Sequence, residues 1–152
     1  VLIFQIPLGF YLVDLDFNEK RLTIESIHVL LGLSIFYITI FRLIYKLFNP
    51  TPPLSNSIFP GQRLIAKLNH VFLYITIIMV TISGALKKLF NGEILDVIFF
   101  SLEIKDNFDL AELFYDIHIV ANYTIISLIS LHILELITHK FLFRENLLKK
   151  IL

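Results

Sequence analysis

Five histidines stand out in an apolar chain, because the imidazole is the commonest side-chain ligand for transition metals in proteins. They are His28, His70, His118, His132 and His139. Two of them, His118 and His132, are 14 residues apart in the run "DIHIVANYTIISLISLHILEL". On an α-helix, 14 steps of 100° come within about 40° of whole turns, so both imidazoles share one face, roughly 21 Å apart along the axis.

The position of His28 suggests a partner for His118. His28 lies at the start of the apolar stretch 27–48, and His118 at the start of the stretch 117–138. In an antiparallel bundle, both stretches begin on the same side, which places the two histidines at matching depth. Zinc needs three or four close ligands, whereas this arrangement gives separated pairs.

Haem suits such pairs better than zinc. Two axial imidazoles from facing helices leave no open position on the iron, so the predicted chemistry is electron transfer. Two haems about 21 Å apart would form a path across a membrane core of about 30 Å. The alternative is that each histidine only hydrogen-bonds a neighbouring helix, as polar residues in membranes often do.

Two further residues share the face of His28. Gly32 follows it by one helical turn, where a missing side chain lets a flat ring lie against the backbone; a helix-packing glycine is the alternative. Arg42 follows His28 by 14 residues and so lies near the opposite membrane surface. Its guanidinium suits the propionates of a second haem, or it extends to the interface and anchors the helix there.

The composition indicates the elements that position these residues. The chain has 152 residues, of which 57% are hydrophobic, and three stretches reach the ~20 apolar residues of a spanning helix, namely 27–48, 68–86 and 117–138. Its mean hydropathy is +0.79. We therefore predict an integral membrane protein with the lipid bilayer as a partner. Cysteine is absent, which excludes disulfides and thiolate-ligated metals, and the net charge of zero gives no argument for nucleic acid.

The first segment, "VLIFQIPLGFYLV" at residues 1–13, is too short to span a bilayer. We expect it to be a first transmembrane helix truncated at its N-terminus, with a re-entrant or interfacial segment as the alternative. The chain then reads as one domain, residues 1–152, with the fold of an all-α membrane protein: an antiparallel four-helix transmembrane bundle. Residues 48–61 hold four of the five prolines and predict a non-helical linker. The stretch "ILDVIFFSLEI" is expected to lie on the membrane surface or cover the bundle.

Charge is distributed unequally between the two ends of this bundle. The side that holds residues 42–67 and the C-terminus has eight basic and two acidic residues, and the opposite side has five basic and eleven acidic ones. The excess of basic residues predicts that the C-terminus lies in the cytoplasm, or in the matrix of an organelle.

These segments resemble the bacterial cytochrome b-561 family of di-haem membrane cytochromes. "SIHVLLGLSIFYITIFRLIYKLFNPTPPL" resembles its second helix, with histidine, glycine, arginine and the proline-rich exit in register. "LNHVFLYITIIMVTISG" resembles the third helix, and "IHIVANYTIISLISLHILELITHKFLFRENLLKKIL" resembles the fourth helix and tail. The resemblance covers nearly the whole chain.

The resemblance implies that His28 and His118 ligate the haem near the outer surface and that His132 ligates the haem near the cytoplasm. The family's partner for His132 comes from the start of helix one, so we expect a histidine a few residues before Val1. His70 would donate to a propionate or replace that ligand, and His139 would be interfacial and solvated.

The chain departs from the family near the inner haem. Large aliphatic side chains and Glu135 follow His132 in "ILEL". Lys67 and Asn69 flank His70, and tryptophan is absent from the sequence. These departures bear on the inner haem and on any quinone pocket beside it.

The resulting hypothesis is a b-type cytochrome with two haems b that exchanges electrons with the quinone pool and a redox partner protein, as an electron carrier or part of a respiratory complex. Its predicted location is the bacterial inner membrane, with the mitochondrial inner membrane as the alternative. A competing hypothesis is an accessory subunit that has kept the fold and lost one or both haems. A channel or transporter is disfavoured, because no span carries a Gly/Pro break or an acidic relay.

Overall fold

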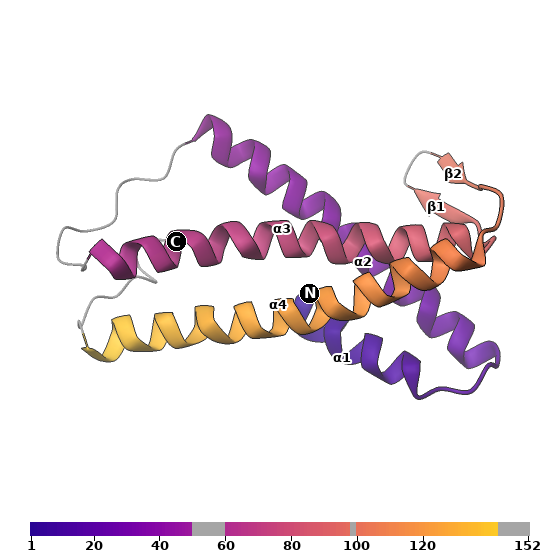
Figure 1. The fold of residues 1–152 in the computed structure, drawn as a ribbon, viewed down its shortest axis with the longest axis horizontal. Helices are drawn as coiled ribbons and strands as arrows, with labels where there is room; N and C mark the ends of the chain where they lie inside the picture. The colour runs from indigo at the N-terminus through magenta and orange to yellow at the C-terminus, as the bar shows by residue number, and fades with distance from the viewer. Residues whose placement is uncertain (50–59, 98–99, 143–152) are drawn as a thin grey trace.

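A computed structural model describes residues 1–49, 60–97 and 100–142, without the side chains of residues 60, 62–63 and 138–142. Four helices and one small hairpin follow each other along the chain (Figure 1). They are α1 (Leu2–Val13), α2 (Glu19–Phe48), α3 (Pro60–Phe90), β1 (Leu95–Val97), β2 (Phe100–Leu102) and α4 (Phe108–Leu142).

Three of the helices, α2, α3 and α4, are long and apolar enough to cross a membrane. Many of their large apolar side chains are exposed, among them Phe41, Leu47, Ile65 and Val120. An apolar surface of this extent fits hydrocarbon rather than water. The hydroxyls of Ser34, Thr124, Ser127 and Ser130 donate to carbonyls one turn earlier in their own helices, so these polar groups need no partner in the lipid. The predicted all-α membrane fold is confirmed.

Each long helix extends beyond the apolar stretch that predicted it. Helix α2 begins within the polar segment, where the Asn18 side chain caps it by accepting a hydrogen bond from the Arg21 backbone N–H at 2.9 Å. Helix α3 already begins at Pro60, inside the range 48–61 that we predicted to be non-helical. The first position of a helix tolerates proline, because the N–H that proline lacks has no helical acceptor there. Residues 50–59 of the predicted linker lie outside the described residues.

The most extensive helix contact joins α3 and α4, which lie side by side along their length (Figure 1). Many of the buried side chains of these two helices are small or polar, and three are large and apolar. The small or polar ones are Ala66, Asn69, Thr76 and Ser83 on α3 and Ala111 and Ala121 on α4, and the large ones are Val80, Leu89 and Ile125. Small residues allow two membrane helices to approach closely. Helix α2 crosses α3 obliquely, and α1 packs on α2.

The apolar run after α3 forms an antiparallel hairpin, in which Asp96 pairs with Ser101. Gly92 makes the turn out of α3 with a φ of 77°, a conformation that favours glycine. Leu95 is buried, and β1 contacts α3. The hairpin therefore attaches to the end of the bundle where α3 ends and α4 begins (Figure 1).

Candidate functional site

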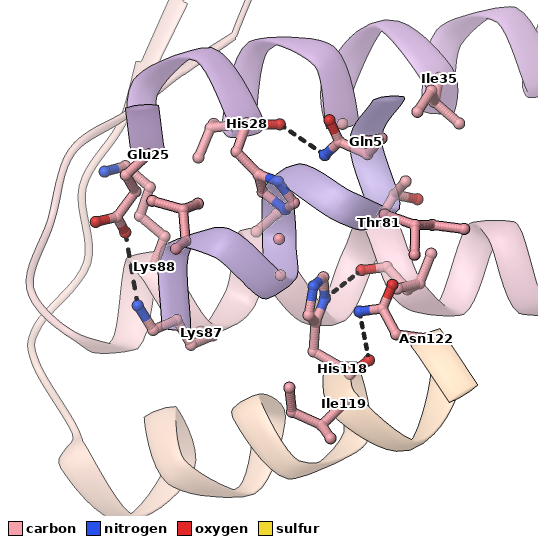
Figure 2. Close-up of a pocket in the computed structure, with 18 of the residues that line it drawn as sticks. Gln5, Glu25, His28, Ile35, Thr81, Lys87, Lys88, His118, Ile119 and Asn122 are labelled. Carbon is pink, nitrogen blue, oxygen red and sulfur yellow. Dashed lines mark hydrogen bonds and ion pairs between the residues drawn. The ribbon is translucent and has the colours of Figure 1, made fainter. Parts of the chain in front are cut away.

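His28 of α2 and His118 of α4 face each other between the helices (Figure 2). Their ring centroids are 6.3 Å apart, and their planes are inclined by 69°. Both residues are partly buried, and both line the same cavity. The structure thus brings together the two histidines that the sequence placed at matching depth.

Helix α3 orients the imidazole of His118. The Nδ1 atom of His118 lies 2.8 Å from the backbone carbonyl oxygen of Val80 and 3.4 Å from the hydroxyl of Ser83. A carbonyl oxygen only accepts hydrogen bonds, so Nδ1 carries the ring proton and donates. The lone pair of the ring is then on Nε2, which is the tautomer that a metal-ligating histidine with such a partner presents.

Helix α1 contacts His28 in a different way. The Gln5 side chain donates from Nε2 to the backbone carbonyl of His28 at 2.9 Å (Figure 2). The Oε1 atom of Gln5 and the Nδ1 atom of His28 are buried without a hydrogen-bond partner in the described part of the chain. The backbone of α2 is therefore tied to α1, whereas the His28 ring lacks the hydrogen bond that His118 makes.

Two glycines leave room for these imidazoles. A Cβ atom added to Gly84 would lie 2.9 Å from Cε1 and 3.0 Å from Nδ1 of His118. A Cβ atom added to Gly9 would lie 3.1 Å from Cε1 of His28. Each glycine lies one turn after the residue that hydrogen-bonds the same histidine, namely Val80 before Gly84 and Gln5 before Gly9. One turn of α3 and one turn of α1 thus form matching cradles behind the two rings.

The two histidines line a cavity of about 270 Å³, formed by residues of all four helices. Its walls are mainly apolar near the rings, and Gly32 lies in the wall beside Gln5. Towards the ends of α2 and α3 that carry the acidic surplus, the lining becomes charged. The charged residues there are Arg21, Glu25, Lys87 and Lys88.

Most of these charges have defined partners. Lys87 pairs with Glu25 across α2 and α3 at 3.7 Å (Figure 2). Lys88 donates to Glu93 at 2.6 Å. Burial raises the pKa of Glu93, but hydrogen bonds from Lys88 and Asn91 outweigh it and leave the pKa below its ordinary value. Glu93 therefore keeps Lys88 engaged in the turn that follows α3.

A second histidine pair lies further along α3 and α4. The rings of His70 and His132 meet edge to face with centroids 4.8 Å apart. His70 is oriented by the carbonyl of Ala66, 2.8 Å from its Nδ1 atom, and His132 Nδ1 lies 3.8 Å from a carboxylate oxygen of Glu135. The sequence predicts His70 to be a propionate donor or a replacement ligand, and it does not predict this ring contact.

Of the remaining predicted residues, Arg42 is exposed on the distal part of α2 and lies close enough to His132 for its charge to act on that imidazole. The side chain of His139 lies outside the described residues. Sequence reasoning missed Gln5, Gly9, Val80 and Gly84. Gln5 had a detectable signal, since it is the only polar residue in the apolar run 1–13.

No group of three or more His, Cys, Asp or Glu side chains able to hold a metal ion occurs among the described residues. Among the histidines whose side chains are described, His28 and His118 form a facing pair, an arrangement that suits two ligands of a haem better than it suits a bare ion.

Comparison with known proteins identifies the family. A family model described as prokaryotic cytochrome b561 matches residues 1–152, the whole chain. No curated protein matches the chain. The chain is thus a multi-pass membrane protein of a b-type cytochrome family that transfers electrons, and it belongs to the prokaryotic cytochrome b561 family.

Proposed function

We propose that this protein carries electrons across a bacterial inner membrane on two haems b, one held by His28 and His118 and the other by His132. We further propose that it exchanges electrons with the quinone pool and with a redox partner protein. The observation that carries the proposal is the facing pair His28 and His118, with a centroid separation of 6.3 Å.

The separation suits an iron between the rings. A metal–imidazole nitrogen bond is about 2 Å long, and a ring nitrogen lies about 1 Å from its centroid, so two axial imidazoles have centroids roughly 6 Å apart. The protonated Nδ1 of His118 leaves Nε2 available for such a bond. Gly9 and Gly84 have no side chain that would clash with the imidazole rings of His28 and His118. The apolar wall of the cavity suits the face of a porphyrin. A porphyrin is larger than the cavity, so its edges must extend between the helices.

The bound group would supply reversible one-electron chemistry. His28 and His118 would hold the group between α2 and α4, the Val80 carbonyl keeps the His118 imidazole in a defined tautomer, and apolar side chains of the cavity exclude water. Two histidine ligands would leave no open position for a substrate. This favours an electron carrier over an oxygen-activating enzyme.

The second haem is proposed at His132, roughly 21 Å along α4 from His118. The His70 and His132 centroids, at 4.8 Å, are closer than the roughly 6 Å that an intervening iron requires. We therefore propose that His70 is not the opposite ligand and that another histidine is the partner of His132, as the family resemblance implies.

The haem content of the purified full-length protein tests this function. Pyridine haemochrome analysis should give two haems b per chain, and redox-difference spectra should show both reduced by a quinol in membranes. A protein that contains no haem would contradict the proposal and favour the accessory-subunit hypothesis. Two haems that a quinol does not reduce would contradict the quinone assignment alone.

Substitution of His70 tests the assignment at the second pair. We expect His70→Ala to retain both haems, because the rings of His70 and His132 meet edge to face with centroids 4.8 Å apart, closer than an intervening iron requires. Its effect should be confined to a shift in the potential of the inner haem. Haem content and a redox titration measure these two outcomes. Loss of one haem would identify His70 as an axial ligand and overturn the assignment.

A further inference from the structure

The charged end of the cavity lies one helical turn from the histidine pair. Glu25 precedes His28 by three residues on α2, and Lys87 follows Gly84, the cradle of His118, by three residues on α3. Three residues of helix correspond to about 4.5 Å along the axis. The Glu25–Lys87 ion pair therefore bridges α2 and α3 just beyond the two imidazoles (Figure 2).

Lys87 is not one of the basic residues that set the orientation of the protein in the membrane. It lies at the end of the bundle that has eleven acidic and five basic residues, whereas basic residues that set orientation collect at the opposite end. Its neighbour Lys88 is engaged by Glu93 in the turn after α3. Both lysines line the cavity, and the side chain of Lys87, which pairs with Glu25, is about one-third exposed.

A second cation lies on the same wall. Arg21 precedes Glu25 by one turn of α2, and Arg21, Glu25, His28 and Gly32 recur at spacings of four, three and four residues, so all four lie on one face of the helix and line the cavity. Arg21 is held near the cavity by a hydrogen bond from Nη1 to the carbonyl of Leu15 at 2.7 Å. A guanidinium has five N–H donors, so this bond leaves others for an anion.

We propose that Lys87 and Arg21 form a carboxylate-binding subsite for the two propionates of the haem held by His28 and His118. This inference rests on the proposed function. It orients the haem with its propionate edge towards the acidic end of the bundle and its apolar edges among the apolar side chains. Glu25 shows that a carboxylate reaches the Lys87 ammonium from inside the cavity wall, at 3.7 Å.

The chemistry of the subsite is that of charge-assisted hydrogen bonds in a partly enclosed place. A propionate at the membrane boundary is a costly anion unless a cation or donor compensates it. Two cations on adjacent helices match the two carboxylates that a haem carries on one edge. Glu25 competes for Lys87 and so moderates the strength of the subsite.

Esterified haem tests the subsite through a double-mutant cycle on the full-length protein. Haem-free protein in detergent is reconstituted with haem or with haem dimethyl ester, whose propionates carry no charge, and the affinity of the outer site is measured by absorbance titration. Esterification should weaken binding to the wild type by about tenfold, as expected for losing hydrogen bonds to charged groups. For Lys87→Gln, the same esterification should cost less than about threefold, since the partner of the carboxylate is already gone.

Lys105→Gln is the matched control. Lys105 is an exposed lysine at the same end of the bundle and is absent from the cavity lining, so it should show the full wild-type loss on esterification. Equal ester penalties in the wild type and Lys87→Gln would overturn the subsite while leaving the haem site intact. Failure of the wild type to bind haem at His28 and His118 would instead refute the proposed function, which separates the two failures.

Discussion

Replacement of His118 by alanine is expected to remove the outer haem and leave the haem at His132 in place. His118 is the better oriented of the two imidazoles, because the Val80 carbonyl keeps the proton on Nδ1 and frees Nε2. Without it, a haem would keep one axial bond, from His28. Pyridine haemochrome analysis should then give half the wild-type haem content, and the redox titration should lose one of its two components.

Two further variants make this result specific. His28→Ala should lose the same haem as His118→Ala, because the two rings face each other at 6.3 Å. In His118→Gly, added imidazole should restore a six-coordinate spectrum, since the cavity behind the ring is already shaped for an imidazole. Retention of both haems in His118→Ala would show that the ligand assignment is wrong, and loss of different haems in the two alanine variants would show that they are not a pair.

The facing of His28 and His118 could be predicted because helix periodicity and membrane thickness are strong constraints. A spanning helix has a fixed rise per residue, so the depth of a histidine follows from its distance along the chain. Helices α2 and α4 run in the same direction in an up-and-down bundle, so their first residues lie at one level. The same periodicity placed His118 and His132 on one face of α4.

The contacts behind the rings could not be predicted, for physical reasons that differ between residues. The acceptor for His118 is the backbone carbonyl of Val80, and every residue has such a carbonyl, so the side chain of Val80 carries no signal. Gly84 and Gly9 have many possible roles in a membrane helix, and close packing is the commonest. The ring contact between His70 and His132 depends on the axial register of α3 against α4, which periodicity within one helix does not determine.

Replacement of Gly84 by alanine is expected to have nearly the effect of removing the ligand itself. The new Cβ would lie 2.9 Å from Cε1 of His118, closer than such contacts occur, so either the ring or α3 must move. The ring is not free to move, because Val80 holds its Nδ1 atom at 2.8 Å. Loss of ligand orientation of this kind typically weakens binding by about 10–100-fold. Haem retention during purification and the rate of haem transfer to an acceptor protein measure the loss.

The other two glycines of the cavity supply a graded control for the same substitution. A Cβ at Gly9 would lie 3.1 Å from His28, which requires a small shift, and one at Gly32 would lie 3.5 Å from Gln5, an ordinary contact. Haem loss should therefore fall in the order Gly84→Ala, Gly9→Ala, Gly32→Ala, with Gly32→Ala close to the wild type. Each substitution also favours the helix by about 0.5–1 kcal/mol, because alanine loses less backbone entropy than glycine on folding.

Adding a methyl group displaces the imidazole but stabilises the helix. A loss of haem without a loss of helix stability therefore distinguishes an effect on haem positioning from general damage to the fold. If Gly84 only allows α3 and α4 to pack, its alanine variant should lose thermal stability and both haems together. If Gly84 makes room for His118, the variant should lose the outer haem, keep the haem at His132 and retain its helical circular dichroism. Equal haem retention in the Gly84 and Gly32 variants would contradict the role of the cradle, since only the former meets an imidazole closer than van der Waals contact.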